Sequence, residues 1–433
     1  MEKDFEDIMP WDEDIKAEAL AKLEQEPGTI RATDPAEAAE DPGKVKRKWR
    51  IEITDFLNRV DRGEYVPIKT NIPFIDDLTD GGFIPGTITM IVADPGAGKT
   101  SLCQQLAAQF ARNGLFVSFV NYEMDEGQLF ARDLAREVKP AKTGKKSGLL
   151  YDPTITAGEI LRGYLSPARH KVAEEKAKRF RETLEDYTTN IASRLYYNMF
   201  VIDEDEAGNL TGEPRPIRNT AHDLRLLTRL LTASYKKRRN AAKEAGEDLE
   251  HIHAPILFVD YIQLIATGSE NKINALEEVT GILADYARDG RTLVFAISSA
   301  SKESRRNTQT EKPKKEDEEE PEADGKKTTG RPICIYCDKA RFGDPGKVAR
   351  VQFIGAASKF VSPDYERPRF AGEYEKKGYL CKASANGASV LEYSAAYFIS
   401  LNRERPGRRS GGERPEASKQ NADELISLLN DDE

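Results

Sequence analysis

The 433-residue sequence predicts an α/β fold in which helices cover both faces of a mainly parallel, doubly wound sheet. Short continuous apolar runs, typical of buried parallel strands, alternate with stretches of helical periodicity. A glycine-rich segment, 93–101, joins one such run to a helical stretch, and 39% of the residues are hydrophobic, enough for a sizeable core. The expected strands are ITMIVA (88–93), FVSFV (116–120), MFVID (199–203), ILFVD (256–260) and TLVFAIS (292–298), and the expected helices include 101–113 and 274–289.

The N-terminal segment differs from the rest of the chain in charge. Residues 1–43 hold 14 Asp and Glu against 4 Lys and Arg, whereas the whole chain holds 74 against 65. The formal net charge of −9 therefore belongs to this arm, and the remaining residues together carry about +1. Because the arm has few large apolar residues, it is predicted to be disordered. A near-neutral body with local basic clusters is compatible with a nucleic-acid partner.

An amphipathic linker helix is expected in 44–64. A short helix cannot bury an apolar stripe by itself, so we expect it to dock on the body or on a neighbouring subunit. The stripe follows helical spacing and consists of Trp49, Ile53, Phe56, Leu57 and Val60.

Residues 65–403 form the predicted main domain, which is interrupted by a charged insert at 301–332 with almost no apolar residues. Residues 404–433 form a predicted disordered tail that begins with Gly, Pro and Arg and ends in NADELISLLNDDE. This ending places a small apolar cluster among acidic residues. A docking peptide and a plain disordered end are equally good interpretations of it.

Bulk features favour a cytoplasmic protein without a membrane segment. No apolar run approaches the roughly 18 residues that a spanning helix needs, and the acidic N-terminus lacks the apolar part of a signal peptide. The 4 cysteines give no disulfide framework. Cys334 and Cys337 form a CxxC pair, but zinc needs four ligands, and their offset on a strand points the thiols to opposite faces. We therefore predict a structural role for this pair.

The segment ADPGAGKTS (93–101) stands between an expected strand and an expected helix, as phosphate-binding loops do. Lys99 is predicted to reach the β- and γ-phosphates of ATP, and the Thr100 hydroxyl to ligate Mg²⁺. Ala93 stands where the strict pattern has Gly, and the alternative is a chance glycine-rich turn. Backbone N–H groups and the start of the helix would cradle the phosphates. The predicted nucleotide-binding residues are Asp94, Pro95, Gly96, Ala97, Gly98, Lys99, Thr100 and Ser101.

Two acidic residues complete the predicted catalytic set. Asp260 ends the run ILFVD, the position from which P-loop hydrolases supply a carboxylate for Mg²⁺. Glu123 follows the run FVSFV and is the candidate to polarise the attacking water. We expect the strand before Glu123 to lie next to the P-loop strand, so that Glu123 faces the γ-phosphate. The alternatives are an aspartate that caps a turn and a surface glutamate.

Several motifs resemble one group of ATPases. YEMDEGQL and VDYIQL resemble the catalytic-glutamate segment and the Walker B strand of DnaB-type replicative helicases. TNIPFIDDLTDGGFIPGT resembles the segment before the P-loop strand in DnaB, RadA and KaiC ATPases. KARFGDPGKVARVQF resembles a DnaB segment, and its KARFG is similar to the KNRFG signature of RadA-type branch-migration helicases. The resemblance runs from about Tyr65 to Phe360 and implies a RecA-like ATPase core.

This resemblance implies an active site shared between the subunits of a homo-oligomeric ring, expected to be a hexamer. Lys339 and Arg341 would reach the γ-phosphate held by the neighbouring subunit. An arginine that one subunit supplies to the nucleotide of another, called an arginine finger, raises the hydrolysis rate about 10³–10⁵-fold. The alternative is a pair of solvated cations at a strand end. Single-stranded DNA would pass through the ring, held by basic residues. Candidates in the insert are Lys302, Arg305, Arg306, Lys312, Lys314 and Lys315.

The sequence departs from the DnaB pattern in three places. We expect no N-terminal helical domain of the DnaB type, because the arm 1–43 is too short and too acidic to form one. Ser299 stands where the family has a Gln that senses the γ-phosphate. The insert 301–332 replaces the family's DNA-contacting loop, and its stretch EDEEEPEAD partly neutralises its own basic residues.

The leading hypothesis is an ATP-dependent, ring-forming DNA helicase that translocates on single-stranded DNA in a phage- or plasmid-type replication system. The alternatives are a RadA-like branch-migration or recombination motor and a KaiC-like ATP-dependent assembly switch. The expected partners are further copies of the chain and single-stranded DNA. A primase, a loader or a sliding clamp are candidates to bind the terminal tails.

Overall fold

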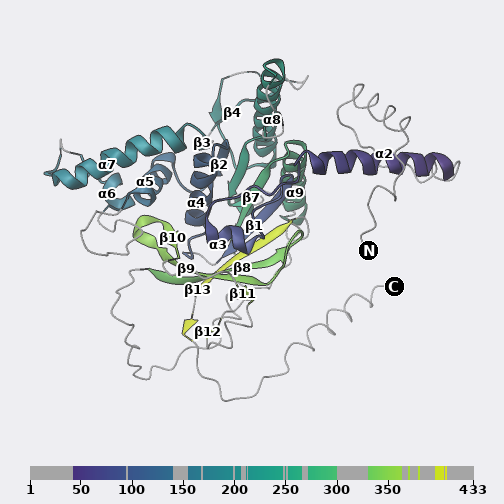
Figure 1. Ribbon diagram of the computed structural model, residues 1–433. Coiled ribbons are helices and arrows are strands. Elements are labelled where there is room, and N and C mark those ends of the chain that lie inside the picture. The colour runs from purple at the N-terminus through teal and green to yellow at the C-terminus, as the bar shows by residue number, and fades with distance from the viewer. Residues whose placement is uncertain are drawn as a thin grey trace, which may run out of the picture.

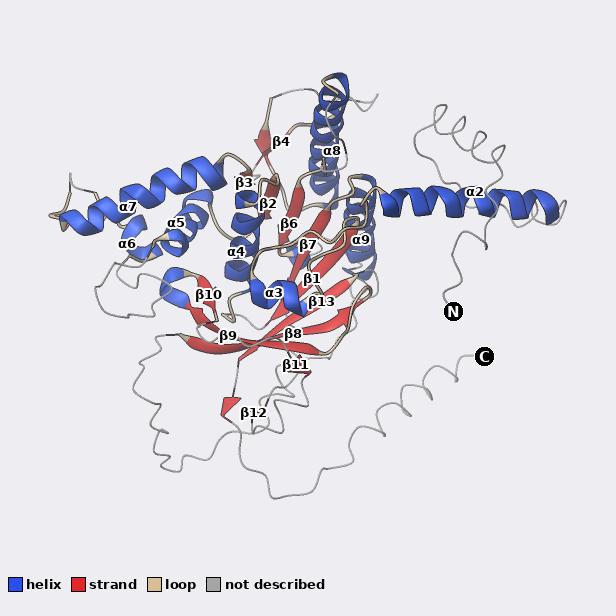
Figure 2. Cartoon of the chain, viewed as in Figure 1, coloured by secondary structure: helices blue, strands red, loops and turns tan. Residues whose placement is uncertain are grey.

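The structure is a computed structural model that forms an α/β fold, with helices on both faces of a central sheet (Figures 1 and 2). Within the described part of the chain, no helix is both long enough and apolar enough to cross a bilayer. The described residues are 42–93, 96–139, 155–166, 169–197, 200–205, 211, 213–246, 249, 252–265, 272–299, 330–362, 369–370, 379–380, 395–403 and 405–406.

The central sheet contains β1 (Thr87–Ala93), β2 (Val117–Asn121), β3 (Leu195–Tyr197), β6 (Ile256–Asp260), β7 (Leu293–Ser299), β8 (Arg331–Ala340), β9 (Lys347–Ile354), β10 (Lys359–Val361), β11 (Arg369–Phe370) and β13 (Tyr397–Arg403). Their order is β10-β9-β8-β13-β1-β7-β6-β2-β3, with β11 paired to β9. The strands from β13 to β3 are parallel, whereas β8 to β11 extend the sheet antiparallel. The mainly parallel α/β sheet predicted from the sequence is confirmed.

Helices cover the two faces of this sheet with separate apolar cores. The described α-helices are α2 (Pro42–Asp61), α3 (Pro73–Leu78), α4 (Lys99–Arg112), α5 (Glu126–Glu137), α6 (Ala157–Leu161), α7 (Glu174–Tyr187), α8 (Ala221–Glu244) and α9 (Lys272–Asp289), of which α2 projects from the body instead of covering the sheet. One core joins α3 and α4 to the sheet, and the other joins α8 and α9 to the opposite face. Side chains alternate between these cores along β1, β6 and β7, as the period of a strand requires.

An aromatic row fixes the lateral order of the strands beneath α4. Phe119, Phe258 and Phe295 come from the successive strands β2, β6 and β7, and their rings stack with interplanar angles of 7° and centroids 5.4 and 4.5 Å apart. Burying one such side chain contributes about 1.5–3 kcal/mol. The row therefore ties together the three strands whose carboxyl ends carry polar residues.

Three boundary predictions are wrong. In the range predicted as the strand 199–203, β4 (Phe200–Val201) pairs with β5 (Arg215–Pro216) outside the central sheet. The sheet takes β3 instead, because Leu195 and Tyr197 are buried whereas Phe200 is 53% exposed. β8 begins at Arg331, inside the predicted insert 301–332, and β14 (Arg405–Pro406) pairs with β12 (Tyr379–Leu380) inside the predicted tail. Residues 301–329 of the insert, 1–41 of the arm and 407–433 of the tail lie outside the described residues.

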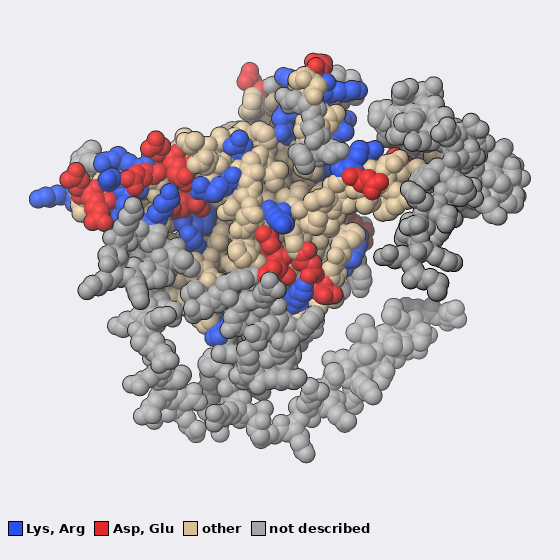
Figure 3. All heavy atoms as spheres, viewed as in Figure 1, with Lys and Arg blue, Asp and Glu red and all other residues tan. Residues whose placement is uncertain are grey.

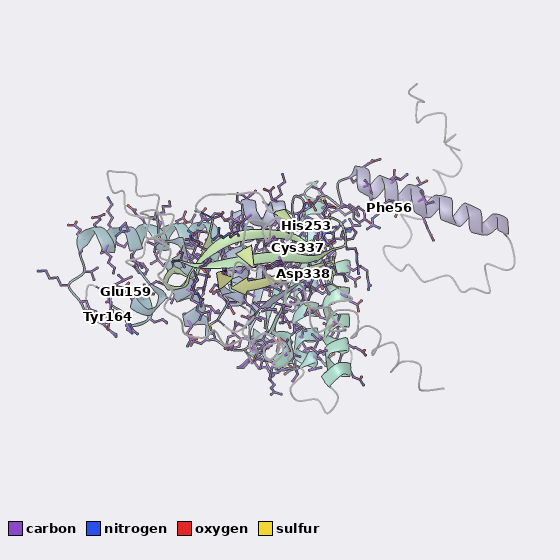
Figure 4. The ribbon with its side chains drawn as sticks, turned by 90° about the horizontal axis from the view of Figure 1, so that it is seen from below. Phe56, Glu159, Tyr164, His253, Cys337 and Asp338 are labelled. Atoms are coloured by element: carbon purple, nitrogen blue, oxygen red, sulfur yellow. The ribbon has the colours of Figure 1, made fainter. Side chains whose placement is uncertain are left out.

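The predicted linker helix corresponds to α2, which projects from the body (Figures 1 and 4). It begins at Pro42, where a proline suits the first turn. Much of its apolar stripe is exposed, although the Phe56 ring contacts Tyr65 with centroids 5.7 Å apart. Of the two expected docking partners, the body and a neighbouring subunit, the neighbouring subunit remains a prediction. The exposed fractions are 48% for Ile53, 49% for Phe56, 39% for Leu57 and 43% for Val60.

Glu64 fixes the base of α2 to the body. Its carboxylate accepts hydrogen bonds from Arg59 at 2.8 Å and Arg62 at 3.0 Å, and it pairs with Arg291 at 2.7 Å. Burial alone would raise the pKa of Glu64, but these arginines lower it below its usual value. Since Arg291 precedes β7, this ion pair anchors the base of α2 to the central sheet.

Candidate active site

The turn between β1 and α4 is bent so tightly that it requires glycine. Gly98 has φ +96°, and a Cβ atom there would lie 2.8 Å from Phe360 Cζ and 3.1 Å from Phe353 Cζ. These two rings stack with centroids 4.6 Å apart. Gln105 of α4 exchanges two hydrogen bonds with the Phe360 backbone, at 3.0 and 2.8 Å. The β9–β10 hairpin thus holds the loop closely against the start of α4.

The predicted phosphate-binding residues differ in how they lie. Lys99 Nζ donates a hydrogen bond to the Ala93 carbonyl at 2.9 Å, which folds the side chain back over the loop. Ala97 is buried in the core, whereas Gly96, Gly98 and Ser101 line the adjacent pocket. Asp94 and Pro95 lie outside the described residues.

Asp260 and Thr100 meet at the centre of the site. The Thr100 hydroxyl donates to Asp260 Oδ2 at 2.6 Å, although 160 positions separate the two residues. Burial raises the pKa of Asp260 to about 6, and the charge of Glu123 also raises it, while Thr100 and Lys99 oppose the shift. Two oxygen donors at this distance, beside a phosphate loop, suit Mg²⁺, which takes few protein ligands and completes its shell with phosphate oxygens and water.

Asn121, which the sequence analysis did not identify, links the two acidic residues. It is 4% exposed, and its side-chain amide donates to Asp260 Oδ2 at 2.9 Å. Its side-chain oxygen accepts the backbone N–H groups of Glu123 at 2.8 Å and Met124 at 2.6 Å. Asn121 and Asp260 are direct partners in the β2–β6 register. A polar residue at the last position of a strand, two before Glu123, was the available signal.

The expected position of the Glu123 strand is wrong. β2 does not neighbour β1, because β6 and β7 lie between them. Glu123 nevertheless reaches the P-loop pocket, since the carboxyl ends of β1, β6 and β2 open to the same side of the sheet. After α4 the chain passes the positions of β7 and β6 before it adds β2 to the sheet. Apolar runs in a sequence do not reveal how many strands such a crossover spans.

An open pocket of about 740 Å³ brings Lys99, Thr100, Glu123 and Asp260 together. This volume is in the range of small-ligand sites. Arg132 of α5 also lines it, and the charge of Arg132 lowers the pKa of Asp260. The pocket can therefore accommodate anionic phosphates, a divalent cation and a water next to a carboxylate.

Lys339 and Arg341 lie at the opposite edge of the sheet, and neither lines this pocket. The Arg341 N–H donates to the Ala396 carbonyl at 2.8 Å, and the Ala396 N–H donates to Ile88 at the amino end of β1, also at 2.8 Å. The P-loop, by contrast, leaves the carboxyl end of β1. Figure 4 shows Asp338, the residue before Lys339, well away from Glu159 of α6, the helix whose first residues line the pocket.

A further cation beside the P-loop was not anticipated. The exposed side chain of Arg331 donates to the Gly96 carbonyl at 2.7 Å and lies over the Phe353 ring at 5.5 Å. Arg331 belongs to the last part of the predicted insert. No local pattern indicated this contact, because 235 positions separate its two residues.

The remaining residues singled out from the sequence are placed only in part. The insert residues predicted to hold DNA lie outside the described residues. Ser299 ends β7 and is the register partner of Ala93, so its backbone adjoins the start of the P-loop. Cys334 and Cys337 are both buried in β8, and among the described residues no cluster of three or more His, Cys, Asp and Glu side chains is placed to hold a metal. In Figure 3, basic and acidic side chains alternate over α7, as on a solvated surface.

Known proteins similar to this chain were found by sequence. The family model described as "ATPase: KaiC" matches residues 68–236. DNA repair protein RadA of Mycobacterium tuberculosis (strain CDC 1551 / Oshkosh) is 33% identical over 76 residues, which is 18% of this chain and 16% of RadA. This chain therefore spans only a small part of the length of that relative. DNA repair and recombination protein RadB of Methanococcoides burtonii is 26% identical over 215 residues, 46% of this chain and 82% of RadB.

Among solved structures, a DnaB-like replicative helicase, described with its interactions with primase, is 16% identical with a TM-score of 0.45. The similarity covers 80% of this chain and 75% of that chain. The parallel sheet, the P-loop between β1 and α4 and the KaiC family match identify the fold as that of a RecA-like P-loop ATPase. Such a domain binds nucleotide and supports its hydrolysis.

Proposed function

We propose that this chain is an ATP-dependent, ring-forming DNA helicase that translocates on single-stranded DNA, of a phage- or plasmid-type replication system. The observation that carries this proposal is the separation of Lys99, Glu123 and Asp260 from Lys339 and Arg341, at opposite edges of one sheet. Residues so separated cannot act on one nucleotide within a single chain. They can do so when the finger edge, the edge of the sheet that carries Lys339 and Arg341, faces the pocket of the next subunit.

In the proposed mechanism, the pocket residues act on nucleotide held by their own chain. Lys99 neutralises the β- and γ-phosphates, and Glu123 takes the proton of the attacking water. Thr100 and Asp260 would hold Mg²⁺, which supplies charge neutralisation at the phosphates. Lys339 and Arg341 of the next subunit would stabilise the charge that develops on the transferred phosphoryl group. Nucleotide turnover would then depend on the geometry between subunits, as a motor requires.

The exposed stripe on α2 supports a homo-oligomer, which we propose to be a hexamer. Phe56 lies on a helix that projects from the body and whose base is fixed by Glu64 (Figure 4), and Leu57 of the same helix is 39% exposed. Because these side chains are already about half buried, covering each of them on a neighbouring copy would stabilise the assembly by roughly 1 kcal/mol. We propose that α2 links each subunit to the next, while the arm 1–43 and the tail 404–433 bind a primase, a loader or a sliding clamp.

A DNA substrate is supported by the names of the relatives, which are DNA repair and recombination proteins. The test is the ATPase rate of the full chain with single-stranded, forked and duplex DNA, together with its mass in solution with a nonhydrolysable ATP analogue. The motor hypothesis predicts that single-stranded DNA raises the rate several-fold and that the analogue produces a closed oligomer. An equal rate with all three DNAs would contradict it.

Two alternatives are kept because specific observations favour them. The RadA and RadB similarity favours a branch-migration or recombination motor, which would be stimulated by branched DNA more than by a single strand. The KaiC family match favours an ATP-dependent assembly switch. So does Ser299, which stands where DnaB-type helicases have the Gln that senses the γ-phosphate. A switch would hydrolyse ATP at one rate with or without DNA and would change its oligomeric state with the nucleotide bound.

A further inference from the structure

We propose that Asp80 is a positioning residue for residues 341–346, the finger turn, which joins β8 to β9 and begins with Arg341. This inference rests on the active site that we propose to be shared between subunits. Asp80 lies between α3 and β1, so it belongs to the segment that leads into the P-loop strand of its own chain. It would act on the neighbour's nucleotide through the shape of the finger turn.

The carboxylate of Asp80 contacts the finger turn at Asp344 and the first residue of β9 at Lys347. Asp80 Oδ2 accepts the backbone N–H of Asp344 at 2.8 Å. Asp80 Oδ1 accepts a hydrogen bond from Lys347 Nζ, at the first residue of β9. Burial alone would raise the pKa of Asp80, but these two contacts lower it below its usual value. The carboxylate therefore stays ionised at neutral pH and opposite Lys347.

The fit between Asp80 and the finger turn is close. A Cβ atom on Gly343 would collide with Asp80 Oδ2. Asp80 itself has φ +57°, a conformation that Asp tolerates better than most residues. The backbone behind it is equally constrained, because Gly82 has φ +129° and a Cβ there would lie 2.5 Å from the Ile68 carbonyl. The segment is therefore bent in a way that presents the carboxylate to the turn.

The two ends of the finger turn have their own backbone contacts. The Arg341 N–H is held by Ala396, and the Gly346 N–H donates to the Cys337 carbonyl at 2.7 Å. Between these ends, Phe342 is 55% exposed and Asp344 is tied to the body by Asp80. Loss of Asp80 would loosen the middle of the turn, next to Arg341. A displacement of about 1 Å in a catalytic group can cost about 10²-fold in rate.

The first test is Asp80→Ala in the full chain. We expect kcat for ATP to fall about 10- to 100-fold, while the Kd for a fluorescent ADP analogue stays unchanged, because the chain's own pocket is intact. Asp80→Asn keeps an oxygen acceptor for the Asp344 N–H and should regain part of the rate. The matched control is Asp77→Ala, which removes the same charge from α3 and has no hydrogen bond to the finger turn among those of the described residues. A kcat for Asp80→Ala equal to that of the control would overturn the proposal.

The second test distinguishes positioning from misfolding. Asp80→Ala subunits keep a working pocket, and Glu123→Gln subunits keep a working finger turn. In an equal mixture, about a quarter of the interfaces combine the two working halves, so we expect activity to reappear in proportion. Activity that stays at the level of the unmixed variants at every ratio would overturn the proposal. Gly343→Ala, which displaces the Asp80 carboxylate from the other side, should behave in the same way.

The failure of this inference can be told from the failure of the proposed function. Arg341→Ala mixed with Glu123→Gln tests the shared site without Asp80. If that mixture recovers activity and the Asp80→Ala mixture does not, Asp80 has no positioning role and the shared site remains. If neither mixture recovers activity, both proposals are contradicted.

Discussion

At the carboxyl edge of the parallel strands, Asp260 already accepts hydrogen bonds from Thr100 at 2.6 Å and from Asn121 at 2.9 Å. At the amino edge of the same sheet, Arg341 and Phe342 are exposed, and their turn is held from beneath by Asp80. At the carboxyl edge, the polar side chains of the pocket hold one another in place by hydrogen bonds. At the amino edge, the turn that begins with Arg341 is held at its base and exposed at its tip.

Under the proposed function, the difference teaches how one chain would carry two halves of a site that only neighbouring subunits complete. Groups that bind phosphate and metal gain from being fixed before the ligand arrives, because their reorganisation then costs little. Groups that act on another subunit must stay exposed, so their support has to come from behind. This comparison predicts that changes at the pocket edge act within one chain, whereas changes at the finger edge act on the neighbour.

The largest effect is expected when the pocket edge loses its base. Glu123→Gln should lower kcat about 10²- to 10⁴-fold, because an amide cannot take the proton of the attacking water. Binding of a fluorescent ADP analogue should be unchanged. Glu126→Gln, an exposed residue in the first turn of α5, is the matched control and should keep normal activity. A rate for Glu123→Gln equal to that of the control would show that Glu123 is not the base that takes the proton of the attacking water.

A smaller loss is expected at the residue that ties the pocket together. Asn121→Ala removes the hydrogen bonds to Asp260 and to the Glu123 backbone. The unpaired groups should cost about 1–3 kcal/mol of stability, and the misplaced acidic pair should lower kcat roughly 10- to 100-fold. Asn121→Asp should be worse, since it sets a second carboxylate beside Asp260. Steady-state kinetics check both variants. An Asp variant as active as the wild type would show that Asn121 does not position the acidic pair.

Self-association should depend on the apolar stripe of α2. Phe56→Ser removes a half-exposed aromatic residue from α2 and should weaken self-association about tenfold or more. The unfolding temperature of the monomer should fall slightly, because the Phe56 ring also contacts Tyr65. Sedimentation at several concentrations measures this. Glu52→Gln on the same helix serves as the control. Equal association for the two variants would argue against α2 as a subunit contact.

The last predicted effect is on stability, not on activity or assembly, and has the opposite sign. The pKa of Asp260, raised by burial to about 6 from 3.8, means that its stabilising contribution is present at low pH and is lost as the pH rises through about 6. Above about pH 7, Asp260→Asn should therefore raise the unfolding free energy of the metal- and nucleotide-free protein by at most about 3 kcal/mol. Its unfolding temperature should rise accordingly. The advantage should vanish near pH 4. A variant less stable than the wild type at neutral pH would contradict the buried-carboxylate account.

The sequence was sufficient for the fold class and for the turn between β1 and α4, because strand, turn and helix are local patterns. It also directed attention to Glu123 and Asp260, which the structure brings to one pocket. Asn121 was missed because its role depends on the pairing of β2 with β6, and the neighbour expected for β2 was wrong for the same reason. Asp80 and Asp344 are 264 positions apart, so spacing could not relate them.

The most direct measurement of the shared site is the ATPase rate of mixtures of Arg341→Ala and Glu123→Gln subunits. Each variant alone should be nearly inactive while it still binds nucleotide, with a loss of about 10³-fold or more for the arginine. Mixing should restore activity, with a maximum near equal amounts, because some interfaces then pair an intact pocket with an intact finger turn. Activity that stays at the unmixed level at every ratio would contradict an active site built from two subunits.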